Sequence, residues 1–257
     1  MAIITLLTDS GNQDHYVAAI KAKILSVNPG LRIEDITHQI APGNMSQASF
    51  VLNSVFRDYP KGTVHLVGVD SIAVSEAGYL AASIEDHFFV APDNGILSLV
   101  SERPITQVIT LNALPQAPTT FPEKEILAPA AARLASGVAL SDLGKPIASI
   151  VRLTQRQLKT SRQQILGFVV HVDHQGNLIT NITRQAFEQI GSGRKFMVRF
   201  GRERSDRIQN YYHESEPGDC FVLFNSSGFM EVGINRGNAS RLLGLGADSP
   251  VNILFED

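Results

Sequence analysis

The chain has 257 residues, of which 44% are hydrophobic and 18% charged, so it can bury a substantial core and is not intrinsically disordered. Its formal net charge of -3, without any basic tract, lacks the usual electrostatic signature of nucleic-acid binding. One cysteine excludes an intrachain disulfide framework and a multi-cysteine zinc site. No apolar run reaches about 18 residues, the length of a membrane helix. We therefore expect a cytoplasmic protein that binds neither nucleic acid nor membrane.

The N-terminal part alternates predicted strands and helices. Residues 16–27 carry apolar side chains near helical spacing and stop before Pro29, which predicts a helix. The same reasoning predicts strands at 3–8, 32–37, 63–70, 87–92 and 105–111, and further helices at 46–59 and 126–136. This alternation indicates a mostly parallel sheet covered by helices.

The chain changes character beyond residue 140. Residues 141–164 are polar and lack a long apolar period, so we interpret them as a linker. Short strands separated by turn residues follow at 167–173, 178–183, 195–200, 207–212, 220–226, 229–235 and 251–255, with a short helix at 239–243. We predict an α/β protein with an N-terminal sheet domain, residues 1–140, and a smaller β-barrel or sandwich domain, residues 165–257.

Carboxylates follow two of the predicted N-terminal strands. Asp9 ends the first strand and Asp70 ends the third, while Asp14 stands where the first helix begins. Ligands of open α/β sheets bind beyond the carboxyl ends of the strands, so Asp9 and Asp70 are candidate ligand contacts. Asp14 is open to two interpretations, a ligand contact or a simple helix cap.

Polar residues also gather at turns of the second domain. Asp173 and Asn177 flank a turn between two strands, and the pair Tyr211-Tyr212 precedes a Glu-Pro-Gly turn. Each of these residues alone is explained by a turn or by a half-buried strand position. Together they offer hydrogen-bond acceptors, amides and an aromatic ring to a small polar ligand. The glycine motifs of dinucleotide and P-loop sites and the zincin and serine-hydrolase motifs are missing. We expect no metal and no cofactor.

Several ordered blocks resemble the S-adenosylmethionine hydroxide adenosyltransferases, the relatives of fluorinase and chlorinase enzymes. The blocks are TLLTDSGNQDHYV, SVNPG, IEDITHQI, YPKGTVHLVGVD, FFVAPDNGILSLV, LAPAAARLASG, VDHQGNLITNI and NSSGFMEVGINRGNAS. The resemblance spans nearly the whole chain. It implies a homotrimer that binds an adenosyl ligand and displaces methionine from its C5' carbon, with water or a halide as the nucleophile.

The resemblance also assigns roles to individual residues. Asp9 resembles the carboxylate that holds the ribose hydroxyls, and Asp14 and Asp173 resemble contacts to the methionine amino group. In the family the ligand lies between the N-terminal domain of one subunit and the C-terminal domain of the next.

The remaining assignments concern the adenine ring and the methionine carboxylate. Asn177 resembles the asparagine that reads adenine, Tyr211 falls where an aromatic ring stacks on adenine, and Arg236 supplies backbone near it. Ser226 resembles a contact to the methionine carboxylate.

The sequence departs from the family at the residues that position the attacking water. Asp70 is present, but Ala77 and Pro122 stand where an arginine and a histidine are expected. The resemblance therefore implies an S-adenosylmethionine hydrolase that forms adenosine and methionine slowly, with Asp70 as its catalytic residue. The alternatives are a non-catalytic adenosine- or S-adenosylmethionine-binding protein, and a transferase that uses another nucleophile.

Overall fold

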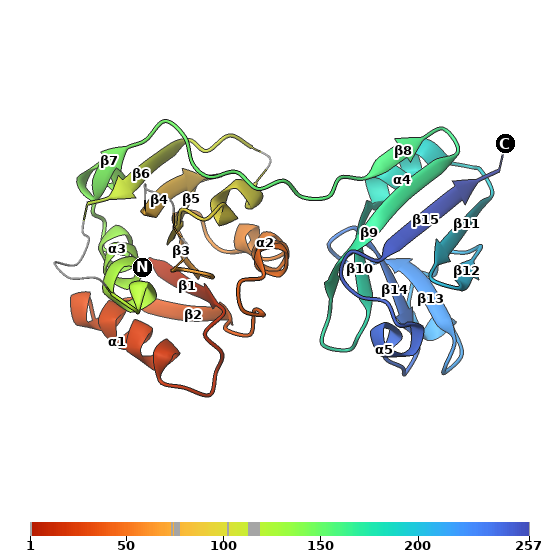
Figure 1. Cartoon of the computed structure of the whole chain (residues 1–257), viewed down its shortest axis with the longest axis horizontal. Helices are drawn as coiled ribbons and strands as arrows, with labels where there is room; N and C mark the ends of the chain where they lie inside the picture. The colour runs from red at the N-terminus through yellow and green to blue at the C-terminus, as the bar shows by residue number, and fades with distance from the viewer. Residues whose placement is uncertain (1, 73, 75–77, 102, 113–118, 257) are drawn as a thin grey trace. The chain divides into compact units, whose positions relative to one another are not determined.

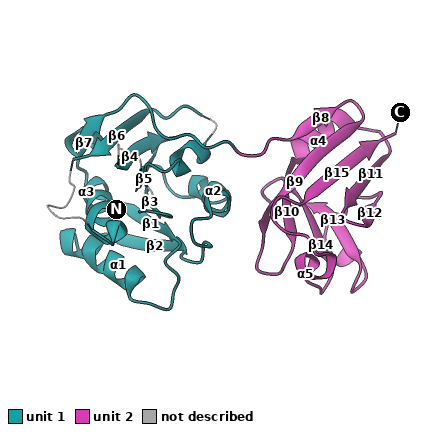
Figure 2. Cartoon of the chain, in the orientation of Figure 1, with its two compact units in different colours: residues 1–154 teal, residues 155–257 magenta. Residues whose placement is uncertain are grey.

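The computed structural model describes residues 2–72, 74, 78–101, 103–112 and 119–256, and these divide into two compact units. Unit 1 is Met1–Thr154 and unit 2 is Gln155–Asp257 (Figure 2). Ala77, the expected arginine position, lies outside the described residues. Within the described part, no helix combines the length and hydrophobicity of a membrane span.

Unit 1 is built on a seven-stranded sheet with strand order β2-β1-β3-β5-β4-β6-β7. The strands are β1 (Ile3–Thr8), β2 (Arg32–Thr37), β3 (Val64–Gly68), β4 (Tyr79–Ile84), β5 (His87–Pro92), β6 (Gln107–Leu111) and β7 (Gly144–Pro146). The neighbours β2, β1, β3 and β5 are parallel, whereas β4, β6 and β7 pair antiparallel. The parallel part brings the carboxyl ends of β1 and β3 side by side.

Helices cover both faces of this sheet (Figure 1). Helices α1 (Tyr16–Val27) and α3 (Ala128–Ala135) pack on one face, against a core that includes Ile4 and Leu66. Helix α2 (Met45–Asn53) packs on the other, where Leu7 and Val67 are buried. Alternate residues of β1 and β3 therefore serve opposite cores, as strand geometry requires.

Unit 2 contains a strongly curved antiparallel sheet that nearly closes into a barrel, with order β12-β11-β15-β9-β10-β14-β13 and β8 paired to β9. Its strands are β8 (Lys159–Ser161), β9 (Gln164–Val172), β10 (Leu178–Thr183), β11 (Phe196–Phe200), β12 (Glu203–Ser205), β13 (Cys220–Phe224), β14 (Phe229–Ile234) and β15 (Pro250–Phe255). Helices α4 (Arg184–Gly191) and α5 (Ala239–Leu243) complete it (Figure 1). One apolar core fills this unit.

The α/β class and most elements agree with the sequence-based prediction. The helices at 16–27 and 239–243 and the strand at 32–37 have the predicted bounds. Strand β4 and helix α4 were not anticipated, and β7 and β8 lie inside the stretch 141–164 that was expected to be a linker.

One predicted strand is wrong. Residues 207–212 form no regular strand, because Gln209 makes a single bridge to Leu223 and a short 3-10 turn, Tyr212–Glu214, begins directly after Tyr211. The Gln209 side chain accepts a hydrogen bond from the Val222 N–H at 2.9 Å. This bond attaches the segment to β13 although the two do not form a regular β-ladder.

Candidate functional site

The carboxyl ends of β1 and β3 are tied together by Asp9. Its Oδ2 atom accepts hydrogen bonds from the backbone N–H of Asp70, at 3.1 Å, and of Gly43, at 3.0 Å. Asp9 thus links the ends of two parallel strands to the loop before α2. The structure brings together the two carboxylates that sequence reasoning placed at this edge of the sheet.

Asp70 occupies an unusual backbone conformation. Its φ of 47° is left-handed, which costs free energy for any residue with a Cβ and recurs at functional sites. Asn94, in the turn after β5, supports it by donating from Nδ2 to the carbonyl of Val69, at 2.8 Å, and of Asp70, at 3.1 Å. With its backbone N–H and carbonyl both fixed, the exposed side chain of Asp70 is presented to solvent at the sheet edge.

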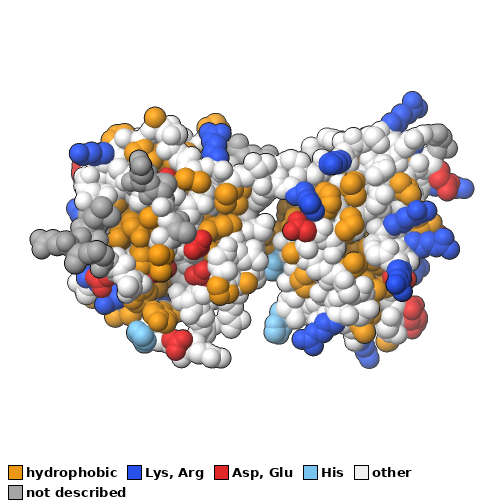
Figure 3. Space-filling view, viewed as in Figure 1, with side chains coloured by type: hydrophobic (Ala, Val, Ile, Leu, Met, Phe, Trp, Pro, Cys, Tyr) orange, Lys and Arg blue, Asp and Glu red, His pale blue; other side chains and the backbone are white. Residues whose placement is uncertain are grey.

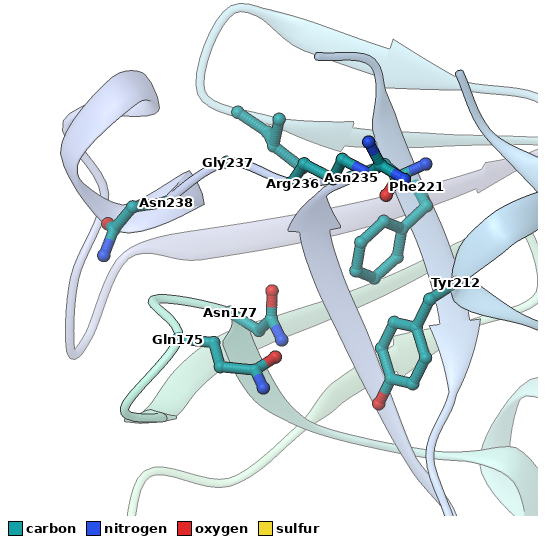
Figure 4. A pocket seen from close by; sticks show the side chains of 9 residues that line it. Gln175, Asn177, Tyr212, Phe221, Asn235, Arg236, Gly237 and Asn238 are labelled. Carbon is teal, nitrogen blue, oxygen red and sulfur yellow. The ribbon is translucent and has the colours of Figure 1, made fainter. Parts of the chain in front are cut away.

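Unit 2 contains a cavity of about 450 Å³ between the turn at 174–177 and the end of β14 (Figure 4). It is lined by Gln175, Asn177, Tyr212, Phe221, Ile234, Asn235, Arg236, Gly237 and Asn238. The rings of Tyr212 and Phe221 meet edge to face with their centroids 5.2 Å apart. Aromatic rings beside several side-chain amides can bind a flat heterocycle, because the rings contact its face and the amides hydrogen-bond to the polar atoms at its edge.

Asp173 holds Asn177 in this cavity. Its Oδ1 accepts from the Asn177 backbone N–H at 2.8 Å, and its Oδ2 accepts from Asn177 Nδ2 at 3.1 Å. Asn177 is only 4% exposed. Its Oδ1 lies against Gly233, where a Cβ would stand 2.5 Å from that oxygen. Glycine at 233 therefore leaves room for the amide to face the cavity.

A buried carboxyl group stands behind the tyrosine of the cavity. Glu231 is 3% exposed, and burial raises its pKa, while hydrogen bonds from Asn225 and Tyr212 act in the opposite direction. Burial, followed by the nearby charge of Glu231 and their mutual hydrogen bond, raises the pKa of Tyr212 to about 12. Tyr212 is therefore neutral at physiological pH and keeps its hydroxyl proton.

The other predicted contacts fall in more exposed places. Asp14 is exposed before α1, and the N-cap position of that helix is His15, without a side-chain cap, so the capping alternative for Asp14 is wrong. Tyr211 is 62% exposed and stacks on His213. Ser226 is exposed in the turn between β13 and β14.

Arg236 joins Asn177 in the lining of the cavity, with a left-handed φ of 57°. Sequence reasoning named Tyr211 and Tyr212 together as possible stacking rings, but it assigned the adenine contact to Tyr211 and did not single out Phe221. The adjacent Tyr211 had been preferred on motif position alone, and Phe221 reads as a core residue of an apolar strand. The sequence does not distinguish Tyr211 from Tyr212. Which of the two rings lines the cavity depends on the tertiary structure around the 3-10 turn Tyr212–Glu214.

Charged side chains are mixed on the surface. On the face drawn in Figure 3, basic side chains are interspersed with acidic and apolar ones on both units. Within the described ranges, no group of three or more histidine, cysteine or acidic side chains is arranged to hold a metal ion.

The two sheets define a two-unit α/β protein with a carboxylate pair at the strand ends of unit 1 and a polar, partly aromatic cavity in unit 2. The profile of the SAM hydroxide adenosyltransferase N-terminal domain matches residues 4–144, and that of the C-terminal domain matches residues 167–252. The chain belongs to the SAM hydroxide adenosyltransferase family.

Named relatives agree with this membership. An (R)-S-adenosyl-L-methionine hydrolase from Thermus thermophilus is 31% identical over 99% of this chain and 100% of its own length. A fluorinase from an Actinoplanes species is 27% identical over 91% of both chains. The crystal structure of an uncharacterized conserved protein from Thermotoga maritima superposes with a TM-score of 0.89 at 31% identity, covering 98% of this chain and 99% of that one.

Proposed function

We propose that this protein hydrolyses S-adenosylmethionine to adenosine and methionine. The observation that carries the proposal is the pair of carboxylates, Asp9 and Asp70, fixed at the carboxyl ends of neighbouring parallel strands in a chain of this family. Three relatives with 28–31% identity over at least 94% of this chain are named (R)-S-adenosyl-L-methionine hydrolase, which supports hydrolysis over other adenosyl transfers.

The reaction needs positioning more than strong acid catalysis. A water oxygen forms a bond to C5' while the C5'–S bond breaks, and its electron pair returns to the sulfonium, which leaves as the thioether of methionine. The attacking water loses one proton. Because the sulfonium is already a good leaving group, neither an acid nor a cofactor is required to expel it. The protein holds water, C5' and sulfur in line and limits competing water around them.

We assign Asp70 to orienting the water and Asp9 to the ribose hydroxyls. Both side chains stand at the same sheet edge, and a carboxylate accepts hydrogen bonds from a diol or from water. Asp14 and Asp173 are assigned to the methionine amino group, and Ser226 to the methionine carboxylate.

We assign adenine recognition to the cavity of unit 2. Asn177 would read the base edge, with the backbone around Arg236 beside it. Tyr211 was the ring expected to stack on adenine, but Tyr212 is the tyrosine that lines the cavity, so both are candidates for this contact.

Product analysis tests the proposal. Purified protein is incubated with S-adenosylmethionine, and adenosine and methionine are measured by chromatography, with Asp70→Asn as the matched variant. We expect equal amounts of both products, at a rate below roughly 1 s⁻¹ because the arginine and histidine of the family are replaced. Saturable binding without product formation would overturn hydrolysis in favour of a binding protein. Product containing a nucleophile other than water would indicate a different transferase.

The assembly is a separate proposal. We expect a cytoplasmic homotrimer, as the family resemblance implies. Light scattering checks the trimer directly, and a stable monomer at micromolar concentration would contradict it.

A further inference from the structure

A third carboxyl group, Glu123, lies at the sheet edge that holds Asp9 and Asp70. It begins a five-residue π-helix, Glu123–Leu127, that leads into α3. Short π-helical turns are rare and frequently occur at functional sites. Phe121 anchors this segment by meeting the ring of Tyr16 on α1 edge to face, with centroids 5.2 Å apart. Glu123 itself is buried, with 9% of its surface exposed.

Close packing against β3 fixes the position of the Glu123 side chain. A Cβ built on Gly68, the last residue of β3, would lie 2.6 Å from Cγ of Glu123 and 3.4 Å from the Thr8 methyl group. Only glycine at 68 permits this approach. The Glu123 side chain therefore crosses the end of β3 at Gly68, two residues before Asp70, and lies beside Thr8 at the end of β1.

The groups around Glu123 favour its protonated form. Burial is the largest influence and raises the pKa of its carboxyl group, and the charge of Asp9 raises it further. Its own backbone N–H, followed by the nearby Ser71 hydroxyl, lowers the pKa. From β4, the neutral Tyr79 faces it and donates its hydroxyl hydrogen bond to the Ser71 carbonyl at 3.0 Å.

Two lysines near this short helix act on a different carboxylate. Lys124 forms an ion pair with Glu125 at 2.9 Å, and Lys23 of α1 also lowers the pKa of Glu125. Glu125 is thus the ionised, solvent-accessible neighbour of a buried carboxyl group on the same short helix.

We propose that Glu123 is the proton acceptor of this site and takes the proton that the attacking water loses. This rests on the proposed hydrolysis. Pro122 occupies the position at which the family resemblance predicts a histidine, and the side chain of the next residue packs over the end of β3, close enough for the charge of Asp9 to act on its carboxyl group. As the water oxygen bonds to C5' and sulfur leaves with its electron pair, the water proton moves to the Glu123 carboxylate and then to solvent.

Burial and the charge of Asp9 raise the pKa of the Glu123 carboxyl group, and a raised pKa makes its carboxylate a stronger proton acceptor. Only the deprotonated form can accept the proton. The hydrolysis rate should therefore rise with pH as Glu123 loses its own proton.

The first experiment measures kcat and KM for S-adenosylmethionine against pH in four proteins: the parent, Glu123→Gln, Glu123→Asp and the matched control Glu125→Gln. Glu123→Gln should lower kcat by roughly 100-fold or more, the usual contribution of a general base, and should remove the rise with pH while KM changes little. Glu123→Asp should restore part of kcat and the pH dependence. Glu125→Gln should behave as the parent. An unchanged rate and pH profile in Glu123→Gln would overturn the proposal.

The second experiment does not depend on turnover. A cationic ligand beside a protonated carboxyl group favours its ionised form and expels a proton. The probe is sinefungin, which carries an amine in place of the sulfonium. Titration calorimetry in buffers of different ionisation enthalpy should show proton release from the parent that is lost in Glu123→Gln, and little release with neutral adenosine. Equal release by parent and Glu123→Gln would remove Glu123 from the site.

The two readouts separate the two proposals. Glu123-dependent proton release in a protein that forms no adenosine would overturn hydrolysis and keep Glu123 as the titrating group of the site. Hydrolysis that is insensitive to Glu123→Gln would keep the proposed function and overturn the role of Glu123.

Discussion

Asp9 accepts a hydrogen bond from the backbone N–H of Asp70 at 3.1 Å, so one carboxylate fixes the chain that presents the other. The same oxygen atom also accepts from Gly43 at 3.0 Å. Asp9 therefore has a structural role in the loop besides the ribose contact that we assign to it. The left-handed φ of Asp70 is maintained by this bond on one side and by Asn94 on the other.

Replacement of Asp9 should weaken adenosine binding. Asp9→Ala removes a charged hydrogen-bond acceptor, which is worth about 1.5–3 kcal/mol per bond, and releases the N–H groups of Asp70 and Gly43. Calorimetry with adenosine measures the loss of affinity, and Asp58→Ala, an exposed aspartate on the same unit, is the control. Equal affinity in Asp9→Ala and the parent would exclude Asp9 from the ligand site.

Replacement of Asn177 should weaken binding and reduce the preference for adenine. Asn177→Ala removes an amide from the cavity and leaves Asp173 without its side-chain partner. Loss of one net hydrogen bond of about 0.5–1.5 kcal/mol corresponds to a two- to tenfold loss of adenosine affinity. Calorimetry with adenosine and inosine is the test, and His174→Ala in the same turn is the control. An unchanged preference for adenosine over inosine would contradict adenine recognition by Asn177.

Gly68→Ala should destabilise unit 1 by overpacking. The new methyl group would lie 2.6 Å from Cγ of Glu123, and overpacking of this kind costs about 1–3 kcal/mol. In a Glu123→Ala background the clashing atom is gone, so the same substitution should cost much less. Urea unfolding of the parent, both single variants and the double variant measures this coupling. Additive effects would show that Glu123 does not pack over Gly68.

Unit 1 should lose stability in mild acid through His65. This side chain is fully buried, and burial, followed by the neighbouring His87, lowers its pKa to about 3. An unfolded histidine has a pKa near 6.5, so below that pH the unfolded state binds a proton that the folded state excludes. The contribution of neutral His65 is complete above about pH 6.5 and is lost as the pH falls toward about 3, by at most about 1.4 kcal/mol per pH unit.

The comparison of His65→Gln with the parent isolates this contribution. Urea unfolding followed by circular dichroism at pH 7 and pH 5 should show a smaller loss of stability in the variant. The exposed His213→Gln in unit 2 should lose as much as the parent. If His65→Gln lost as much stability between pH 7 and pH 5 as the parent, groups other than His65 would cause the acid sensitivity.

The sequence by itself determined the α/β class and the elements with a strong local signal. Helix 16–27 and strand 32–37 were predicted to the residue because periodicity and flanking turn residues act within a few positions. The motif blocks likewise identified the family. The apolar strand patterns placed Asp9 and Asp70 at strand ends, where parallel pairing of β1 and β3 makes them neighbours.

Only the tertiary structure decided which side chains share a site. Tyr212 lines the cavity with its ring against Phe221, whereas the ring of Tyr211 stacks on His213. Glu123 stands among charged residues in the sequence, next to Lys124 and Glu125, yet it is buried over Gly68, 55 residues earlier in the chain. The hydrophobic periodicity of a sequence segment indicates hydrogen bonding and burial within one helix or strand only. The burial of Glu123, and with it the raised pKa of its carboxyl group, depends on contacts between elements that are far apart in the sequence.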